Sequence, residues 1–119
     1  MCGVTARPSL IEFPADDVQR ALAFWSGLLG EELAARGGGG EGSGWQTASG
    51  GAEDGPAIGV HARGAGPGDR FSLPYFAVAD MSAALGRVKE LGGSVIHPGE
   101  GWSVCRDSEG TPFGLALER

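Results

Sequence analysis

The sequence predicts an α+β fold made of two copies of one unit, in which a strand and a helix precede three further strands. Three observations predict this fold. Two segments carry apolar residues at helical spacing, a short apolar run precedes each of them, and short apolar runs separated by turn residues follow. With 119 residues, the chain fits a single domain spanning residues 1–119.

The first unit is expected to open with a strand at residues 10–13, followed by a helix over residues 17–29. Asp16 or Asp17 can accept hydrogen bonds from the first free backbone amides, and Gly30 can end the helix in a left-handed conformation. The apolar residues of this segment form the stripe of an amphipathic helix. They are Val18, Ala21, Leu22, Trp25, Leu28 and Leu29.

The second unit is expected to open with a strand at residues 73–78, followed by a helix from Asp80 that ends before Gly92 and Gly93. Its apolar residues recur at the same helical spacing, which again predicts an amphipathic helix. They are Met81, Ala84, Leu85, Val88 and Leu91.

The two units align without a gap at an offset of 63 positions. This register relates caps, apolar stripes and helix ends at once, so we interpret it as an internal duplication. Module 1 covers about residues 9–63 and module 2 about residues 71–118. The matched pairs are Asp17/Asp80, Ala21/Ala84, Leu22/Leu85, Leu28/Leu91, Gly30/Gly93 and Phe13/Phe76.

Three short strands are expected after each helix, divided by glycine-rich or acidic turns. A module of this size cannot bury both faces of its sheet, so its helix should cover one face and a partner the other. The strands are expected at residues 31–35, 44–48 and 57–62 in module 1, and at 94–97, 102–106 and 112–117 in module 2.

Composition excludes several classes of function. Nine basic and fifteen acidic residues give a net charge of −6, without the basic cluster that binding to nucleic acid or an anionic membrane requires. The longest apolar runs fall short of the roughly 20 residues of a spanning helix, and no secretion signal is evident at the start. Cys2 and Cys105 provide no disulfide framework, so we expect a cytoplasmic protein with Cys105 as a buried thiol.

Several motifs, in this order, resemble the vicinal oxygen chelate superfamily, which includes glyoxalase I, extradiol dioxygenases and bleomycin-resistance proteins. They are the segments 11–17, 21–25 and 28–30 in the first half and 75–80, 88–93 and 107–113 in the second. The resemblance implies a curved mixed sheet around a cleft, helices on its outer face, and a homodimer.

The resemblance also implies where metal-dependent members place their metal ligands. Here those positions hold Leu10, Pro74 and Gly114, with a fourth near Val60 or His61. Leu, Pro and Gly side chains have no donor atoms for a metal. We therefore expect no metal and no cofactor at the family position, and only Glu12, His61 and Glu118 could hold a displaced metal.

Three polar residues are candidates for contact with a ligand. Glu12 alternates with Ile11 and Phe13, so it should face the cleft if those two pack under the helix. There it could bind a polar or cationic group, or it could be an exposed carboxylate at the mouth of the cleft. His61 and Arg63 share one strand parity and could orient a ligand, although His61 could equally be a solvent-exposed residue at a strand end.

Three aromatic residues are candidates for stacking on a flat ligand. Trp45 and Trp102 lie in short strands beside glycines, and Phe76 shares the parity of Pro74 and Val78, which we expect to face the cleft. The remaining aromatic side chains are assigned mainly to the core. These are Phe13, Phe24, Trp25, Tyr75 and Phe113.

The glycine-rich segment 37–42 contains a GxGxxG pattern, but a strand rather than a helix is expected after it. A dinucleotide site needs that helix, so we interpret the segment as a hairpin loop.

Together these features favour a metal-free homodimer that sequesters a small aromatic, antibiotic-like ligand over an enzyme. The main alternative is a lyase, isomerase or dioxygenase with a displaced metal site or acid–base catalysis by Glu12 or His61. A further alternative is a regulatory or interaction module whose cleft is filled by its own side chains.

Overall fold

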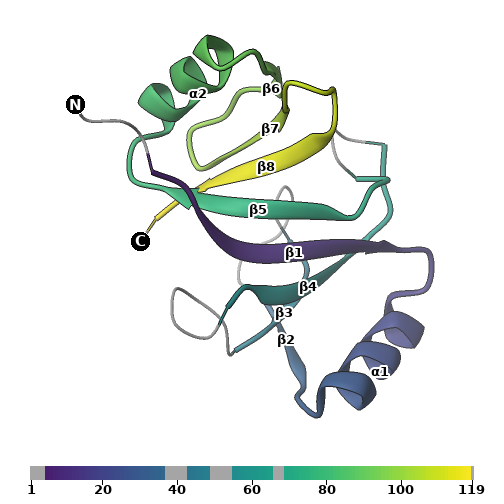
Figure 1. The fold of residues 1–119 in the computed structure, drawn as a ribbon. Coiled ribbons are helices and arrows are strands. Elements are labelled where there is room, and N and C mark those ends of the chain that lie inside the picture. Colours follow the sequence, from purple (N-terminus) through teal and green to yellow (C-terminus); the bar gives the residue numbers. More distant parts are fainter. Residues whose placement is uncertain (1–4, 37–42, 49–54, 66–68, 119) are drawn as a thin grey trace.

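The computed structural model describes residues 5–36, 43–48, 55–65 and 69–118, and these ranges form an α+β fold with two helices and an eight-stranded mixed sheet (Figure 1). The predicted fold class is confirmed at this level. In chain order the elements are β1 (Arg7–Ala15), α1 (Val18–Leu29), β2 (Leu33–Ala35), β3 (Trp45–Thr47), β4 (Ala57–Ala62), β5 (Leu73–Val78), α2 (Met81–Glu90), β6 (Ser94–His97), β7 (Trp102–Arg106) and β8 (Pro112–Leu117).

The sheet is open, with the strand order β2-β3-β4-β1-β5-β8-β7-β6. β1 runs parallel to β4, and β5 runs parallel to β8. β1 and β5 pair antiparallel in the middle of the sheet, where they join the strands of the two halves of the chain (Figure 1). Residues from both halves therefore contribute to one continuous surface.

Both helices begin and end as their sequences predict. The side chain of Asp17 accepts a hydrogen bond from the backbone N–H of Arg20 at 3.0 Å, and Asp80 accepts one from Ala83 at 3.0 Å. These contacts satisfy amides that have no partner within the helix. Gly30 ends α1 with φ of 72°, a left-handed conformation that favours glycine.

Most strands lie where they were predicted, and β1 differs most. The prediction began at residue 10, whereas the strand begins at Arg7. The added residues are exposed or half-buried, so they carry no apolar signal. They are extended because β5 pairs with this end of β1, with Arg7 opposite Ala77. β2 and β3 are shorter than predicted.

One face of the sheet carries both helices, and we call it the helix face. The Phe13 ring stacks on Trp25 of α1 with centroids 4.6 Å apart. Ile11 lies two residues before Phe13 and therefore on the same face, and it pairs with Pro74 on β5. Val78, four residues beyond Pro74 on the same strand, lies on this face as well. Val78 belongs to the buried cluster under α2, whose other members are Met81, Ala84, Cys105 and Leu115.

The opposite face, which we call the inner face, carries Glu12. Glu12 pairs with Leu73 across β1 and β5, so both side chains lie on this face. Tyr75, two residues beyond Leu73 on β5, lies on this face as well. It pairs with Gly114 on β8, and Gly114 pairs with Val104 on β7, so Val104 also lies on the inner face. Leu73 and Val104 are each only 1% exposed although no helix of the described chain covers them. Parts of the chain other than the helices therefore cover these two side chains.

One smaller expectation is also met. Cys105 is fully buried, as predicted for a structural thiol. Within the described residues, neither helix is long and apolar enough to cross a membrane.

Candidate functional site

Three charged side chains from different elements meet on the inner face. Glu12 lies on β1, His61 on β4, and Arg36 directly after β2. The Glu12 carboxylate accepts hydrogen bonds from both terminal nitrogens of Arg36, and its Oε1 lies 2.9 Å from Nδ1 of His61. Arg36 also donates to Oε1 of Gln46 and to the backbone carbonyl of Ser43, each at 3.1 Å. We call Glu12, Arg36 and His61 the charged cluster.

Two glycines make room for the charged cluster. Gly59 lies opposite Glu12 in the β1–β4 register, and a Cβ atom there would lie 2.3 Å from Oε2 of Glu12. A Cβ atom at Gly44 would lie 2.3 Å from a terminal nitrogen of Arg36. A side chain at either position would displace a charged group. Glycine at both positions therefore leaves the space that the charged cluster occupies.

The cluster holds Glu12 ionised although the residue is only 5% exposed. Burial by itself raises the pKa of a carboxyl group. The hydrogen bonds from His61 and Arg36, together with their charges, outweigh that effect and lower the pKa of Glu12. A buried carboxylate that is paired in this way avoids the large cost of an isolated buried charge.

The surroundings of His61 favour its imidazolium form. Its hydrogen bond to Glu12 raises its pKa more strongly than burial lowers it. Its second nitrogen, Nε2, lies 3.4 Å from the backbone carbonyl of Asp69. Since both ring nitrogens face acceptors, the form protonated at both nitrogens satisfies both contacts.

The charged cluster predicts a stability maximum in mildly acidic solution. Glu12 stabilises the fold above its ordinary pKa of 4.5, and this contribution is lost as the pH falls through its lowered pKa. His61 stabilises the fold below its ordinary pKa of 6.5, and this contribution is lost as the pH rises through its raised pKa. Thermal unfolding across this range should show the maximum between these values, and His61→Gln should flatten the alkaline limb. A melting temperature that rises above neutral pH would contradict this assignment.

Tyr75 borders the charged cluster on the inner face. It pairs with Leu10 on β1 and with Gly114 on β8, and its ring lies directly over Gly114. Burial, followed by the negative charges of Glu12 and Asp69, raises the pKa of Tyr75 to about 12. The phenol therefore stays protonated near neutral pH. Its hydroxyl group receives no hydrogen-bond partner within the described ranges, so it can donate to a bound molecule.

Trp102 extends the inner face on the other half of the sheet. It pairs with Ala116 on β8, which pairs with Ala77 on β5, two residues beyond Tyr75. The indole ring of Trp102 stacks on His97 with centroids 4.9 Å apart. This pair presents an aromatic surface on the same face as the charged cluster.

The structure divides the six predicted ligand residues between two faces. Glu12, His61 and Trp102 lie on the inner face, as described above. Trp45 pairs with Val60, which lies opposite Phe13, so Trp45 lies on the helix face. It therefore does not share a surface with Glu12.

Phe76, Pro74 and Val78 share one face, as predicted, and all three line a concave region that lies on the helix face rather than on the inner face. Phe76 lies on the helix face with Val78, packs against the cluster under α2, and meets the Phe113 ring edge to face at 6.0 Å. Its own repeat partner, Phe13, 63 positions earlier, faces α1 and gives the correct orientation. Arg63 also lies apart from the charged cluster, because its guanidinium pairs with Asp16 at 2.7 Å near the surface.

The residues at the family's metal position do not fit a metal ion. Leu10 and Gly114 lie on the inner face without donor atoms, and the Tyr75 ring fills the space over Gly114. Pro74 lies on the helix face, and the residue that corresponds to Leu10 at the 63-residue offset is Leu73. Both carboxylate oxygens of Glu12 are engaged by Arg36 and His61. Among the described residues, no three His, Cys, Asp or Glu side chains gather as metal ligands.

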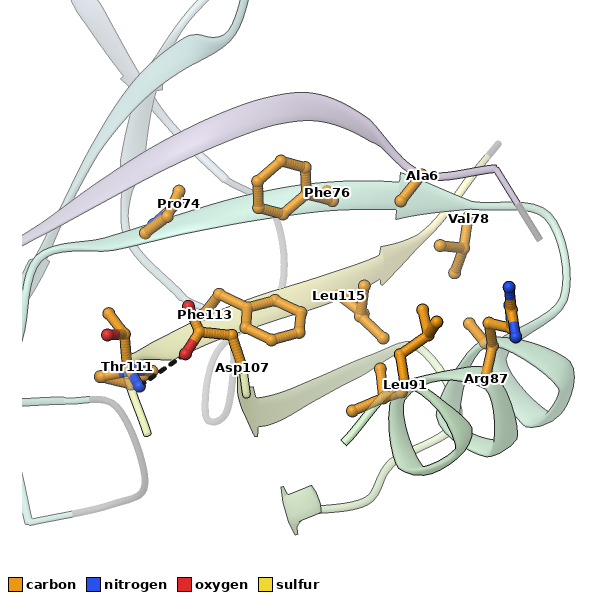
Figure 2. A pocket seen from close by; sticks show the side chains of 13 residues that line it. Ala6, Pro74, Phe76, Val78, Arg87, Leu91, Asp107, Thr111, Phe113 and Leu115 are labelled. Carbon is orange, nitrogen blue, oxygen red and sulfur yellow. Dashed lines mark hydrogen bonds between the residues drawn. The ribbon is translucent and has the colours of Figure 1, made fainter. Parts of the chain in front are cut away.

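A concave region lies on the helix face, between α2 and strands β5 and β8 (Figure 2). We call it the helix-face groove; its volume is about 470 Å³. Figure 2 shows Arg87 of α2 at one end and Asp107 at the other, where Asp107 accepts a hydrogen bond from the backbone of Thr111. The apolar wall includes Pro74, Phe76, Val78, Leu91, Phe113 and Leu115.

Sequence reasoning missed two residues of the site, Arg36 and Tyr75. The predicted strand at 31–35 ended where β2 ends, so Arg36 fell outside it, although continued alternation would have placed its side chain on the face opposite to Leu33. Tyr75 lies 63 positions after Glu12, so the duplication itself would have placed it on the inner face.

Residues 10–116 match the family model described as "Glyoxalase-like domain". An NAD-dependent benzaldehyde dehydrogenase structure from Legionella pneumophila is 13% identical with a TM-score of 0.68, and the match covers 94% of this chain and 100% of that one. This likeness concerns the fold alone.

Two structures from Streptomyces sp. CB03234 also match. The antibiotic-binding protein TnmS3 is 24% identical with a TM-score of 0.39, covering 97% of this chain and 98% of that one. A glyoxalase/bleomycin resistance protein is 25% identical with a TM-score of 0.36, covering 92% and 98%. No curated protein sequence matches this chain significantly.

Proposed function

Because the chain belongs to the glyoxalase-like domain family, we propose that it is a small-molecule binding protein that holds a flat aromatic ligand on the inner face without a metal. One observation carries this proposal. One face of the sheet, which no described helix covers, carries the charged cluster, the Tyr75 hydroxyl and the Trp102 ring. Such a mixture of apolar surface and few placed polar groups is typical of ligand sites.

The spacing of the aromatic residues suits a ligand of several fused rings. Tyr75 and Trp102 lie on strands separated by β8, so two strand spacings, about 10 Å, divide them. Stacking on Trp102 would contribute about 0.5–1.5 kcal/mol beyond burial. The Tyr75 hydroxyl would donate to an acceptor oxygen on the ligand.

The charged cluster serves this site by fixing its polar end. Its members satisfy one another, so the cluster supplies a rigid wall rather than a free charge. The net charge of −6 adds a mild preference for a cationic ligand in the approach to the protein.

The proposed assembly is a homodimer of single-domain chains. Each chain would comprise two modules, at about residues 9–63 and 71–118, in line with the 63-residue offset. A ligand on the inner face would not contact Arg63, Trp45 or Phe76, because Arg63 pairs with Asp16 near the surface and the other two lie on the helix face.

One observation favours a second candidate, an isomerase or lyase that works by acid–base catalysis. His61 pairs with the Glu12 carboxylate, whose charge also acts on the protonated Tyr75, so these groups form a set of proton donors and acceptors. Against this candidate, Glu12 has a lowered pKa and both its oxygens are engaged, which makes it a weak base.

Titration of the protein with a panel of planar aromatic antibiotics tests the proposal, with tryptophan fluorescence as the readout and mass spectrometry of the recovered compound. We expect saturable quenching and a ligand returned with unchanged mass. A returned compound of altered mass would establish an enzyme instead, and loss of that turnover in His61→Gln would assign the proton transfer. Absence of binding across the panel would contradict the proposed ligand class.

Tyr75→Phe should weaken binding of a panel compound by roughly 3- to 10-fold, since it removes one hydrogen bond worth about 0.5–1.5 kcal/mol. The ring itself remains, so the fold and the contact with Gly114 should persist. Titration of both proteins with the same compound provides the measurement. Equal affinities would show that the Tyr75 hydroxyl does not contact the ligand.

A further inference from the structure

Helix α1 presents an apolar surface that nothing in the described chain covers. None of its twelve residues is buried, although its sequence is strongly apolar. Phe24 is 59% exposed and Leu28 is 66% exposed, with Leu29 beside them. We call Phe24, Leu28 and Leu29 the α1 ridge. A contiguous apolar surface of this kind is typical of a contact with another protein.

The helix-face groove is the complementary feature on the same side of the molecule. The Phe13–Trp25 contact places α1 on the helix face, and the groove lies on that face beside α2. Its floor is apolar and aromatic, with Phe76 and Phe113 edge to face. Leu91, at the end of α2, lines the groove and is 62% exposed.

We propose that the α1 ridge of a second copy occupies the helix-face groove, and that the contact is reciprocal. This inference rests on the homodimer proposed above and names its surface. Two copies would face each other with their helix faces, so that the helices form a layer between the two sheets. A two-fold axis then makes two identical contacts, because each copy supplies one ridge and one groove.

The charges at the ends of both surfaces fix the direction of the contact. Arg20 lies near the start of α1, and Glu32 follows its end. Arg87 and Asp107 mark opposite ends of the groove (Figure 2). A partner helix that runs from Asp107 toward Arg87 would bring Arg20 to the carboxylate and Glu32 to the guanidinium. The reverse direction would place like charges together.

Light scattering coupled to size exclusion measures the assembly directly. The wild-type protein should show twice the chain mass of 12.1 kDa. Phe24→Asp on the ridge and Leu91→Asp in the groove should each reduce that mass to a single chain. Both residues are more than half exposed in the monomer, so the substitutions leave the fold intact. Phe71→Asp is the matched control, because Phe71 is 57% exposed outside both surfaces and should leave the mass unchanged.

A charge exchange tests the direction of the contact. Arg87→Glu and Glu32→Arg should each weaken the dimer, and the double variant should restore it. A merely local effect of either substitution would not be reversed by the other. If the double variant stays as weak as the singles, the proposed direction is wrong.

The outcomes separate this inference from the proposals on which it rests. A wild-type protein of single-chain mass would overturn both the homodimer and its surface. A dimer that survives Phe24→Asp and Leu91→Asp would keep the homodimer and overturn the surface. Occupation of the groove by a small molecule would appear as loss of ligand binding in Leu91→Asp but not in Tyr75→Phe, and it too would overturn the surface.

Discussion

Arg36→Met is expected to lower the free energy of unfolding by about 3 kcal/mol, the low end of the range for breaking a buried ion pair. The substitution removes the guanidinium that contacts both oxygens of Glu12, whose side chain is only 7% exposed. Protonated His61 remains as a partner, so the loss should be smaller in acidic than in alkaline solution. Chemical denaturation at both pH values measures the difference.

Two variants provide the controls. Arg63→Met breaks an ion pair with Asp16 in which both side chains are more than 40% exposed, so it should cost at most about 1 kcal/mol. Combining Arg36→Met with Glu12→Gln should recover part of the loss, since no buried charge is left unpaired. If Arg36→Met and Arg63→Met cost the same, the charged cluster does not have the role described above.

Gly114→Ala is expected to destabilise the protein by about 1–3 kcal/mol and to weaken binding on the inner face. Its new methyl group would lie 2.2–2.7 Å from three atoms of the Tyr75 ring, which must then shift from its position. Denaturation and titration with the same panel compound measure both effects.

The matched control is Gly86→Ala in α2, where a Cβ atom meets nothing within 4 Å. That substitution should stabilise the protein by up to about 1 kcal/mol, as alanine is favoured over glycine inside a helix. Adding Tyr75→Ala to Gly114→Ala should relieve the clash, so the two effects should not add. Full additivity would show that the ring is not the obstacle.

The fold could be predicted from the sequence because its signals are local. Asp17 and Asp80 cap helices whose apolar stripes follow at once, and Gly30 ends the first helix with a left-handed conformation. The ends of β1 escaped prediction because they depend on pairing with β5, which is remote in the sequence.

The site was harder to predict because it depends on which face a strand presents. The face of β1 that carries Glu12 was predicted correctly, since Ile11 and Phe13 fixed the helix face of that strand. Phe76 was grouped correctly with Pro74 and Val78, but alternation within a strand does not say whether that group lies on the helix face or on the inner face. The 63-residue offset carries that information, and it assigns Tyr75 to the inner face with Glu12.

Arg36 could not be predicted as a residue of the site for a different reason. It lies beyond β2 beside residues 37–42, and nothing in its immediate sequence links it to Glu12. Its partners come from β1, β3 and Ser43, so only the assembled sheet brings them together.

Fluorescence quenching in two tryptophan variants tests most directly whether the ligand binds on the inner face. Of the three tryptophans, Trp102 lies on the inner face, whereas Trp25 and Trp45 lie on the helix face. With a panel compound that quenches the wild-type protein, Trp45→Phe should retain the quenching and Trp102→Phe should lose most of it. Quenching that persists in Trp102→Phe and disappears in Trp45→Phe would place the ligand on the helix face and contradict the proposed site.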